Sequence, residues 1–207
     1  MRTDPVNDAF DFLVGATNDH QALGPLRLLF TGLFLVLLAA SALIALQRWR
    51  SDETQRGPVP FIGWLLRLSI GIMWFQGCLW KLPLPVSGAL QYWTEQIPAN
   101  AAYPVVADLV RDVALPHMEI VGPLVFALEL GLSISFMLGV FVRPFGAAGA
   151  LYALGLWLGL YRLAAEWPWE YIFLAVAQAQ FALYAAGHTL GIDGWLRRRT
   201  DIVIRRR

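Results

Sequence analysis

The sequence predicts an all-α integral membrane protein with five transmembrane helices. Of its 207 residues, 57% are hydrophobic and 15% are charged, whereas about a quarter of the residues of a soluble domain carry charge. The mean hydropathy of +0.54 agrees with this reading. Crossing a bilayer takes roughly 20 mostly apolar residues. Five stretches reach or approach that length: 23–46, 59–82, 120–142, 147–164 and 169–186.

Prolines indicate where these stretches begin and end. Arg143-Pro144 is expected to close the third, because proline cannot continue a helix. Trp167-Pro168 is expected to open the fifth, where the missing N–H of proline costs nothing. The long connection 83–119 contains an amphipathic segment, 104–115, whose apolar residues recur every three or four positions. We expect this segment to cap the bundle at the membrane surface or to form a lid over an outward-facing site.

The distribution of charge predicts the orientation of the chain. With five crossings, the loop 47–58, the turn at Arg143 and the C-terminal tail lie on one side and hold most of the basic residues. The acidic N-terminus and the loop 83–119 lie on the other side. Because Lys and Arg collect on the cytoplasmic side of membrane proteins, the N-terminus is expected outside and the C-terminus in the cytoplasm.

Composition also excludes several kinds of site. The net charge of +1 argues against nucleic-acid binding. A single cysteine excludes an internal disulfide, a dithiol redox pair and a cysteine-based zinc or iron–sulfur site. The three histidines lie at or beyond the span ends, where two of them cannot clamp a haem, and no nucleotide-binding or hydrolase motif occurs. We therefore expect no haem, metal or nucleotide site.

Two ionisable residues lie deep within predicted spans, where such residues are costly and usually face the bundle interior. Arg67 lies roughly 12 Å from one membrane surface and Glu129 roughly 13 Å from the other. In a hydrocarbon core about 30 Å thick, their levels differ by only a few Å. We predict that they pair across neighbouring helices. The pair either fixes helix register or forms a polar site for a quinone headgroup, a proton or an anion.

Two further residues of the second span share the face that carries Arg67. Trp74 follows at helical spacing, and Lys81 lies at the outer end beside Trp80. Lys81 is either an interfacial anchor or a ligand for an anion. Together with Glu129 they complete the candidate residues for binding substrate or quinone. A shallow charged cluster on the outer face would combine Lys81 with three carboxylates: Glu119, Glu166 and Glu170.

The order of several motifs resembles a known family. The motifs are Arg67-x3-Gly71-x5-Gly77-x3-Lys81, Glu129 with a glycine-containing run to Arg143, and the closing segments 167–171 and 186–193. In these motifs the chain resembles the DoxX/DoxD membrane proteins, especially the DoxD-like small subunit of thiosulfate:quinone oxidoreductase. The resemblance implies a four-helix core at 59–197. Residues 1–58, with the first span, would be an addition to it, and 198–207 would be a basic cytoplasmic tail.

One departure from the family pattern concerns the closing motif. Family members often have an arginine before the closing Leu-Gly-x-Asp, whereas this chain has His188. A histidine there would make a contact with a lipid phosphate or a partner depend on pH. His188, Asp193 and Arg143 are therefore the candidates for contact with lipid or a partner.

The resemblance implies a membrane subunit of a quinone-linked oxidoreductase acting on thiosulfate or a similar sulfur compound. Such a subunit would lie in the cytoplasmic (inner) membrane of a bacterium or archaeon, with quinone as cofactor and a partner protein subunit. Thiosulfate would enter near Lys81 and Glu129 beneath the loop 83–119, and Arg67 and Glu129 would handle the quinone or its protons.

Two alternatives stay open, and the sequence leaves undecided whether the chain is itself an enzyme. The first is a non-catalytic accessory subunit that docks a larger membrane complex through its small-residue faces and extra first helix. The second is a small transporter, for which inverted repeats are expected. No convincing internal repeat is found in the sequence.

Overall fold

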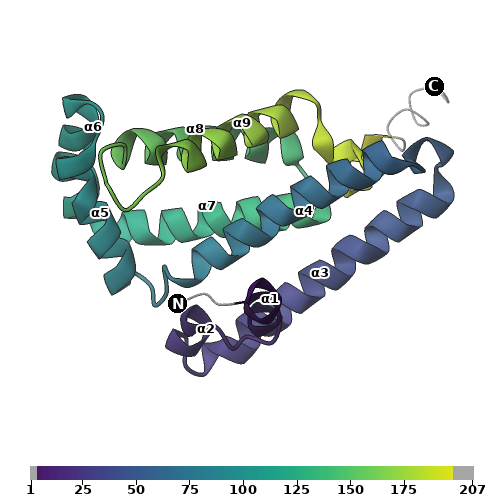
Figure 1. Ribbon diagram of the computed structural model, residues 1–207, viewed down its shortest axis with the longest axis horizontal. Helices are drawn as coiled ribbons and strands as arrows, with labels where there is room; N and C mark the ends of the chain where they lie inside the picture. The colour runs from purple at the N-terminus through teal and green to yellow at the C-terminus, as the bar shows by residue number, and fades with distance from the viewer. Residues whose placement is uncertain (1–3, 198–207) are drawn as a thin grey trace.

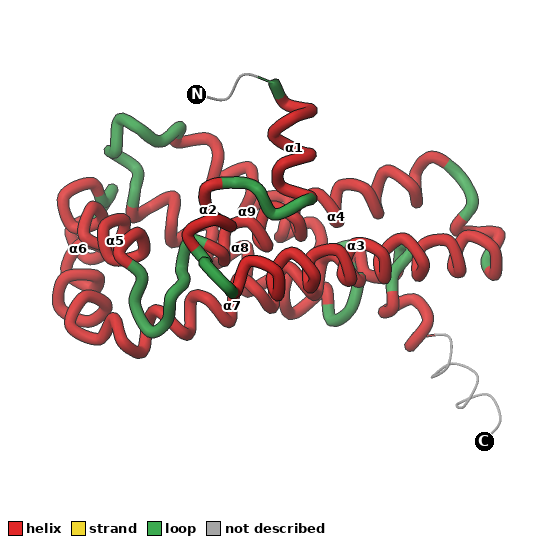
Figure 2. Tube along the Cα trace, turned by 90° about the horizontal axis from the view of Figure 1, so that it is seen from below, coloured by secondary structure: helices red, strands yellow, loops and turns green. Residues whose placement is uncertain are grey.

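The computed structural model describes residues 4–197, and no strand occurs in this range (Figures 1 and 2). The predicted tail 198–207 therefore lies outside the described residues. The α-helices are α1 Pro5–Leu13, α2 Asn18–Ala22, α3 Leu26–Ser51, α4 Pro58–Leu79, α5 Gly88–Asn100, α6 Pro104–Leu109, α7 Met118–Leu138, α8 Val142–Gly159 and α9 Pro168–Leu183. Short helical turns are η1 Glu53–Gln55, η2 Val110–Ala114, η3 Leu115–His117 and η4 Ala186–His188.

Three helical stretches are long and apolar enough to cross a membrane: α3, α4 and the continuous stretch Pro104–Leu138 that ends in α7. These correspond to the first three predicted spans. The last two predicted spans correspond to α8 and α9, which have 18 and 16 residues. At 1.5 Å per residue they measure about 27 and 24 Å, somewhat less than a typical hydrocarbon core.

The expected end of the third span at Arg143-Pro144 is wrong. Helix α7 ends at Leu138, and the next residue, Gly139, caps it with a left-handed backbone (φ 69°). Helix α8 then begins at Val142, so Pro144 lies in its first turn. Proline is tolerated there because its missing N–H would have no helical partner in any case. The proline therefore marks a helix start, and the glycine before it marks the helix end.

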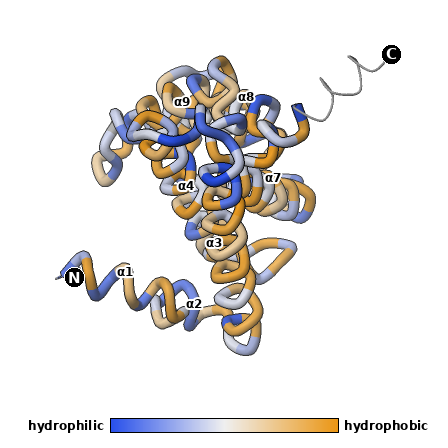
Figure 3. The backbone as a smooth tube through the Cα atoms, turned by 90° about the vertical axis from the view of Figure 1, so that its right-hand side faces the viewer, coloured by the Kyte–Doolittle hydropathy of each residue, from blue (hydrophilic) through white to orange (hydrophobic). Residues whose placement is uncertain are grey.

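Helices α4, α7, α8 and α9 run side by side and form the bundle (Figure 1). Helix α4 packs mainly on α7, and α8 packs mainly on α9. The buried centre of the bundle contains Trp74, Leu132, Phe136, Val142 and Phe181. Hydrophobic residues predominate along α3, α4 and α7, whereas hydrophilic and hydrophobic residues alternate in α1 and α2 (Figure 3).

The two ends of the bundle differ in character. At one end, which we call the capped end, α5, α6 and η2 lie across the helices (Figure 1). The amphipathic segment 104–115 forms part of this cap. The opposite end, which we call the basic end, contains the chain reversals at 52–57, 139–141 and 184–193.

Helix α3 meets α4 at the basic end and diverges from it toward the capped end, where α1 and α2 lie beside the opening (Figure 1). An aromatic series joins these elements. The ring centroids of Phe12 and Phe34 are 4.9 Å apart, and those of Phe34 and Phe75 are 5.1 Å apart. The residues that precede the first span are thus anchored to the bundle through aromatic contacts.

His20 of α2 is a buried titratable residue at the place where α1 and α2 dock. Its ring is fully buried, Nδ1 lies 2.7 Å from Thr17 Oγ1, and Phe12 contacts it edge-on. Burial lowers the pKa of His20 below its usual 6.5, the charge on Asp19 opposes this, and Arg27 lowers the pKa further. The docked state therefore binds the proton less readily than the detached state.

We expect the docking of residues 5–22 to weaken as the pH falls below about 6.5 and to be constant above that value. Amide hydrogen exchange of these residues at pH 7.5 and 5.5, corrected for intrinsic rates, measures this. The variant His20→Leu is expected to abolish the difference between the two pH values. Equal protection of the native chain at both pH values would contradict the prediction.

Candidate functional site

A cavity of about 580 Å³ lies at the capped end, and we call it the Lys81–Glu129 cavity. Residues of α4, α5, α7, α8 and α9 line it, together with η2 and the connection before α9. Its apolar lining includes Trp74, Trp80, Trp93, Leu156 and Leu174. Its polar lining includes Lys81, Glu129, Tyr152, Glu166, Glu170 and Tyr171. An apolar cavity with a few convergent polar groups is typical of a small-molecule site.

A buried ion pair lies in the wall of this cavity. Lys81 Nζ is 2.6 Å from Glu129 Oε2, and the side chains are 4% and 1% exposed. Lys81 also donates a hydrogen bond to the Gly77 carbonyl at 2.8 Å, and its ammonium lies 3.5 Å from the centroid of the Trp80 ring. Tyr152 donates a hydrogen bond of 2.9 Å to Glu129 Oε1. Both buried charges are therefore compensated, as burial in an apolar setting requires.

Local structure explains how the pair forms. Helix α4 ends at Leu79, and Lys81 follows in the turn, from which its side chain reaches back to the carbonyl one turn earlier. Glu129 lies midway along α7. A Cβ added at Gly77 would lie 3.4 Å from Glu129 Oε2. This is ordinary van der Waals contact, and it places Gly77 at the level of α4 that lies beside the Glu129 carboxylate.

Trp74 is positioned by a residue that the sequence analysis did not single out. Its Nε1 donates a hydrogen bond of 3.0 Å to Oε1 of Gln178, which is fully buried in α9. The Gln178 amide donates in turn to the carbonyls of Gly149 and Leu174 at 3.3 and 3.2 Å. The Trp74 ring lies 5.5 Å from that of Tyr152. The available signal was the pair of glutamines, Gln178 and Gln180, within a mostly apolar helix, since polar groups there usually face other helices.

The Lys81–Glu129 cavity has an acidic rim. Tyr171 in α9 donates a hydrogen bond of 3.3 Å to Glu166 Oε2, and Glu170 also lines the cavity. Partial burial raises the pKa of Glu166, the hydrogen bond from Tyr171 opposes this, and the charge on Glu170 raises the pKa further. Lys81, Glu166 and Glu170 of the predicted charged cluster thus line one cavity, and Glu119 is not among its lining residues.

The predicted pairing of Arg67 with Glu129 is wrong. Arg67 is fully buried, and it donates hydrogen bonds to the carbonyl of Phe136 and, at 3.2 Å, to that of Thr189. These acceptors lie at the basic end, where the carbonyls of the last turn of α7 carry the negative end of its dipole. The Arg67 charge is therefore stabilised by backbone carbonyls, while Lys81 pairs with Glu129.

The register of α4 against α7 explains this correction. The two helices are antiparallel, and a Cβ added at Gly71 would lie 2.9 Å from the backbone nitrogen of Met137. Six residues later, Gly77 lies beside Glu129. Arg67 is ten residues before Gly77, which places it about 15 Å along the axis from the level of Glu129. The sequence-based depths of Arg67 and Glu129 were counted from the predicted ends of their own spans. They therefore did not include the register of α4 against α7.

The three candidates for contact with lipid or a partner all lie at the basic end. Asp193 accepts hydrogen bonds from the backbone N–H of Phe141 at 2.8 Å and of Val142 at 3.0 Å, so its carboxylate caps α8. Arg143 is exposed and donates to the Ala182 carbonyl at 3.1 Å. Burial lowers the pKa of His188, and the charge on Arg197 lowers it further. Asp193 thus has an internal role, and Arg143 and His188 remain partly accessible.

Comparisons with protein-family models, curated proteins and solved structures find no match to this chain. The resemblance to DoxX/DoxD proteins therefore stays a prediction from the motifs. Among residues 4–197, no group of three or more His, Cys, Asp or Glu side chains is arranged to hold a metal ion.

Proposed function

We propose that this chain binds a quinone headgroup in the Lys81–Glu129 cavity and is the membrane subunit of a quinone-linked oxidoreductase of the DoxX/DoxD type. The observation that carries the proposal is the buried Lys81–Glu129–Tyr152 group beside a tryptophan-lined apolar cavity. The proposal includes five spans, an outside N-terminus and a cytoplasmic C-terminus. It also includes residence in the cytoplasmic membrane of a bacterium or archaeon.

The residues of the cavity fit a quinone. The tryptophan and leucine side chains offer an apolar surface for a flat ring and its chain. Lys81 offers an ammonium with three N–H donors for carbonyl oxygens, and the single O–H of Tyr152, which now donates to Glu129, can turn to donate to a quinone carbonyl. Glu129 offers a carboxylate within the same hydrogen-bonded group that can hold a proton. A bound quinone would supply the electron-accepting chemistry.

The acidic rim gives protons a route between this group and the surface. Tyr171 and Glu166 are hydrogen-bonded to each other and line the same cavity as Glu129. The raised pKa of Glu166 lies nearer to neutral pH than that of an ordinary carboxyl. A group with a pKa near the working pH both takes up and releases protons readily. Glu166 is thus the group of the rim suited to exchange protons with solvent.

The same rim makes the cavity a poor site for thiosulfate or a similar anion. Glu170 and the deprotonated form of Glu166 carry negative charge at the rim, and the charge of Lys81 is already neutralised by Glu129. A doubly charged anion would be repelled there. We therefore assign oxidation of the sulfur compound to a partner protein subunit and quinone binding to this chain.

The proposal predicts saturable quenching of tryptophan fluorescence by a short-chain quinone, because Trp74, Trp80 and Trp93 line the cavity. The variant Tyr152→Phe keeps the ring but removes the donor hydroxyl. One hydrogen bond contributes about 0.5–1.5 kcal/mol, so binding is expected to weaken by roughly 2- to 12-fold. Titration of the purified chain in phosphatidylcholine nanodiscs measures both effects.

The matched control is Tyr92→Phe, because Tyr92 is exposed in α5 and does not line the cavity. It is expected to bind the quinone as the native chain does. Quenching of the native chain that rises linearly without saturation would exclude a defined site. Equal affinities of the Tyr152→Phe variant and the native chain would exclude this hydroxyl as a quinone ligand.

One observation favours the alternative function as a non-catalytic accessory subunit. Helix α3 diverges from α4, and it exposes apolar side chains along its length, including Leu28, Leu29, Val36 and Leu43. Such a face suits docking to another membrane subunit as well as contact with lipid. Under this alternative, the substitution Val36→Trp would remove a protein that co-purifies in mild detergent, and quinone titration would show no saturable site.

A further inference from the structure

Helix α1 presents two chemically different faces. Val6, Phe10, Leu13 and Val14 fall on one side at helical spacing, and they are 74%, 60%, 37% and 46% exposed. The opposite side carries carboxylates, including Asp8 and Asp11. Phe12, four residues after Asp8 and therefore on the carboxylate side, lines the same cleft as Asp8 and anchors the helix on Phe34 of α3. A nine-residue helix thus leaves most of its apolar surface without a partner in the described part of the chain.

Helix α1 also runs crosswise to the membrane-spanning helices. It is seen end-on in Figure 1, where α3 and α4 run across the view, and it stands perpendicular to α3 in Figure 2. If α3 and α4 cross a bilayer, α1 therefore lies in the plane of that bilayer. This is the orientation of an interfacial amphipathic helix, whose apolar face is buried about 5–10 Å into the boundary between headgroups and acyl chains.

The depth of α1 agrees with that orientation. A cleft of about 770 Å³ separates it from α4, and Gln76 and Ile72 line the α4 side of this cleft. Gln76 lies three residues before the end of α4, which is about 4.5 Å along the axis. Helix α1 is thus level with the last turns of α4 at the capped end.

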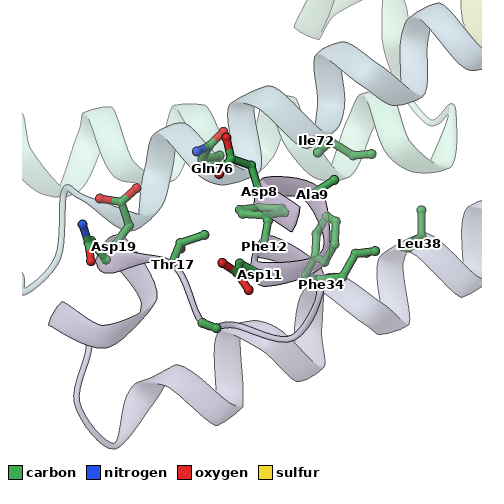
Figure 4. Close-up of a pocket in the computed structure, with 13 residues that line it drawn as sticks. Asp8, Ala9, Asp11, Phe12, Thr17, Asp19, Phe34, Leu38, Ile72 and Gln76 are labelled. Atoms are coloured by element: carbon green, nitrogen blue, oxygen red, sulfur yellow. The ribbon is translucent and has the colours of Figure 1, made fainter. Parts of the chain in front are cut away.

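The faces of α1 are turned in the direction that an interface requires. In Figure 4, Asp8 and Asp11 lie on the side nearer Gln76 and Thr17, whereas Ala9 lies on the side nearer Ile72 and Leu38. Ile72 is deeper in α4 than Gln76 is. The carboxylates therefore face the capped end. Val6 and Leu13, three residues before and four residues after Ala9, share its side of the helix, so this part of the apolar face is turned toward the middle of the spans.

We propose that α1 is an interfacial membrane helix whose Val6–Phe10–Leu13–Val14 face inserts into the lipid leaflet at the capped end. The partner is the phospholipid bilayer itself. Leu28 and Leu29, near the start of the neighbouring span α3, are also exposed, at 76% and 63%, and would face lipid. The inference does not depend on quinone binding.

Site-directed spin labelling of the full chain in phosphatidylcholine vesicles tests the proposal. The native chain is a natural blank, since Cys78 is fully buried. A label at Phe10→Cys reports the apolar face, one at Asp11→Cys reports the carboxylate face, and one at Leu28→Cys is the lipid-facing reference. Accessibility to oxygen, which concentrates in lipid, is compared with accessibility to a water-soluble nickel chelate.

The ratio of oxygen to nickel accessibility is expected to be several-fold higher at position 10 than at position 11, and to approach the ratio at position 28. A label at position 10 that is more accessible to nickel than to oxygen would overturn the proposal, because the face would then point to water. A label at position 10 that is shielded from both reagents would also overturn it, because a second copy or another protein would cover the face.

Discussion

Replacing Lys81 with methionine is expected to lower the free energy of unfolding by about 3–5 kcal/mol, because it leaves the Glu129 carboxylate buried without its charge partner. The Lys81 and Glu129 side chains are almost completely buried, and their charged groups are 2.6 Å apart. The remaining hydrogen bond from Tyr152 cannot compensate a full negative charge. Reversible unfolding in mixed micelles of a mild detergent and sodium dodecyl sulfate, followed by tryptophan fluorescence, measures the change.

The chain contains a matched control for this prediction. Arg111 and Asp108 form an ion pair at 2.8 Å, but their side chains are 55% and 56% exposed. Exposed pairs contribute about 0–1 kcal/mol, so Arg111→Met is expected to have little effect. If Arg111→Met and Lys81→Met lower the free energy of unfolding equally, burial of the Lys81–Glu129 pair does not explain the loss of stability in Lys81→Met.

A double substitution separates the structural role of the pair from its proposed role in binding. In Lys81→Met with Glu129→Leu, both charges are removed, so no unpaired charge remains. We expect this variant to be more stable than Lys81→Met alone, since apolar replacement of a whole buried pair is often neutral or favourable. It is nevertheless expected to lose saturable quenching by a short-chain quinone. Retained quenching would show that the pair has only a structural role.

Replacing Gly139 with alanine is expected to destabilise the basic end by about 2–5 kcal/mol. Gly139 has φ 69°, and an L-residue in that conformation costs about 1–2 kcal/mol. An added Cβ would also lie 2.6 Å from Arg67 Nη1 and 2.7 Å from the Cα of Gly191. The shifts that such overpacking forces on its neighbours lower the stability by about 1–3 kcal/mol more. The Arg67 guanidinium would have to leave the carbonyls that now accept its hydrogen bonds.

A second glycine serves as the control for this substitution. Gly155 lies in α8, is exposed, and would place an added Cβ in open space. Alanine there is expected to be neutral or to stabilise the helix by about 0.5–1 kcal/mol. Unfolding midpoints of the two variants, measured in the same micelles, give the comparison. A Gly139→Ala chain as stable as the native one would mean that the basic end adapts without cost.

Amino-acid composition and apolar run length determined that the chain is helical and suited to a membrane. An apolar stretch can satisfy its backbone in lipid only as a helix or in a closed barrel, so the stretches themselves restrict the fold. The individual residues Lys81, Trp74 and Glu129 were also found from sequence, because charged and amphipathic side chains within apolar spans are costly unless they face one another.

Only the tertiary structure decided which of these residues meet. Whether Glu129 pairs with Arg67 or with Lys81 depends on the axial register of two antiparallel helices, which is fixed by contacts such as Gly71 with Met137 and Gly77 with Glu129. A shift of a few residues moves a side chain several Å along the axis. A single sequence contains no direct signal for such contacts between distant segments, since they arise from the packing of both helices together.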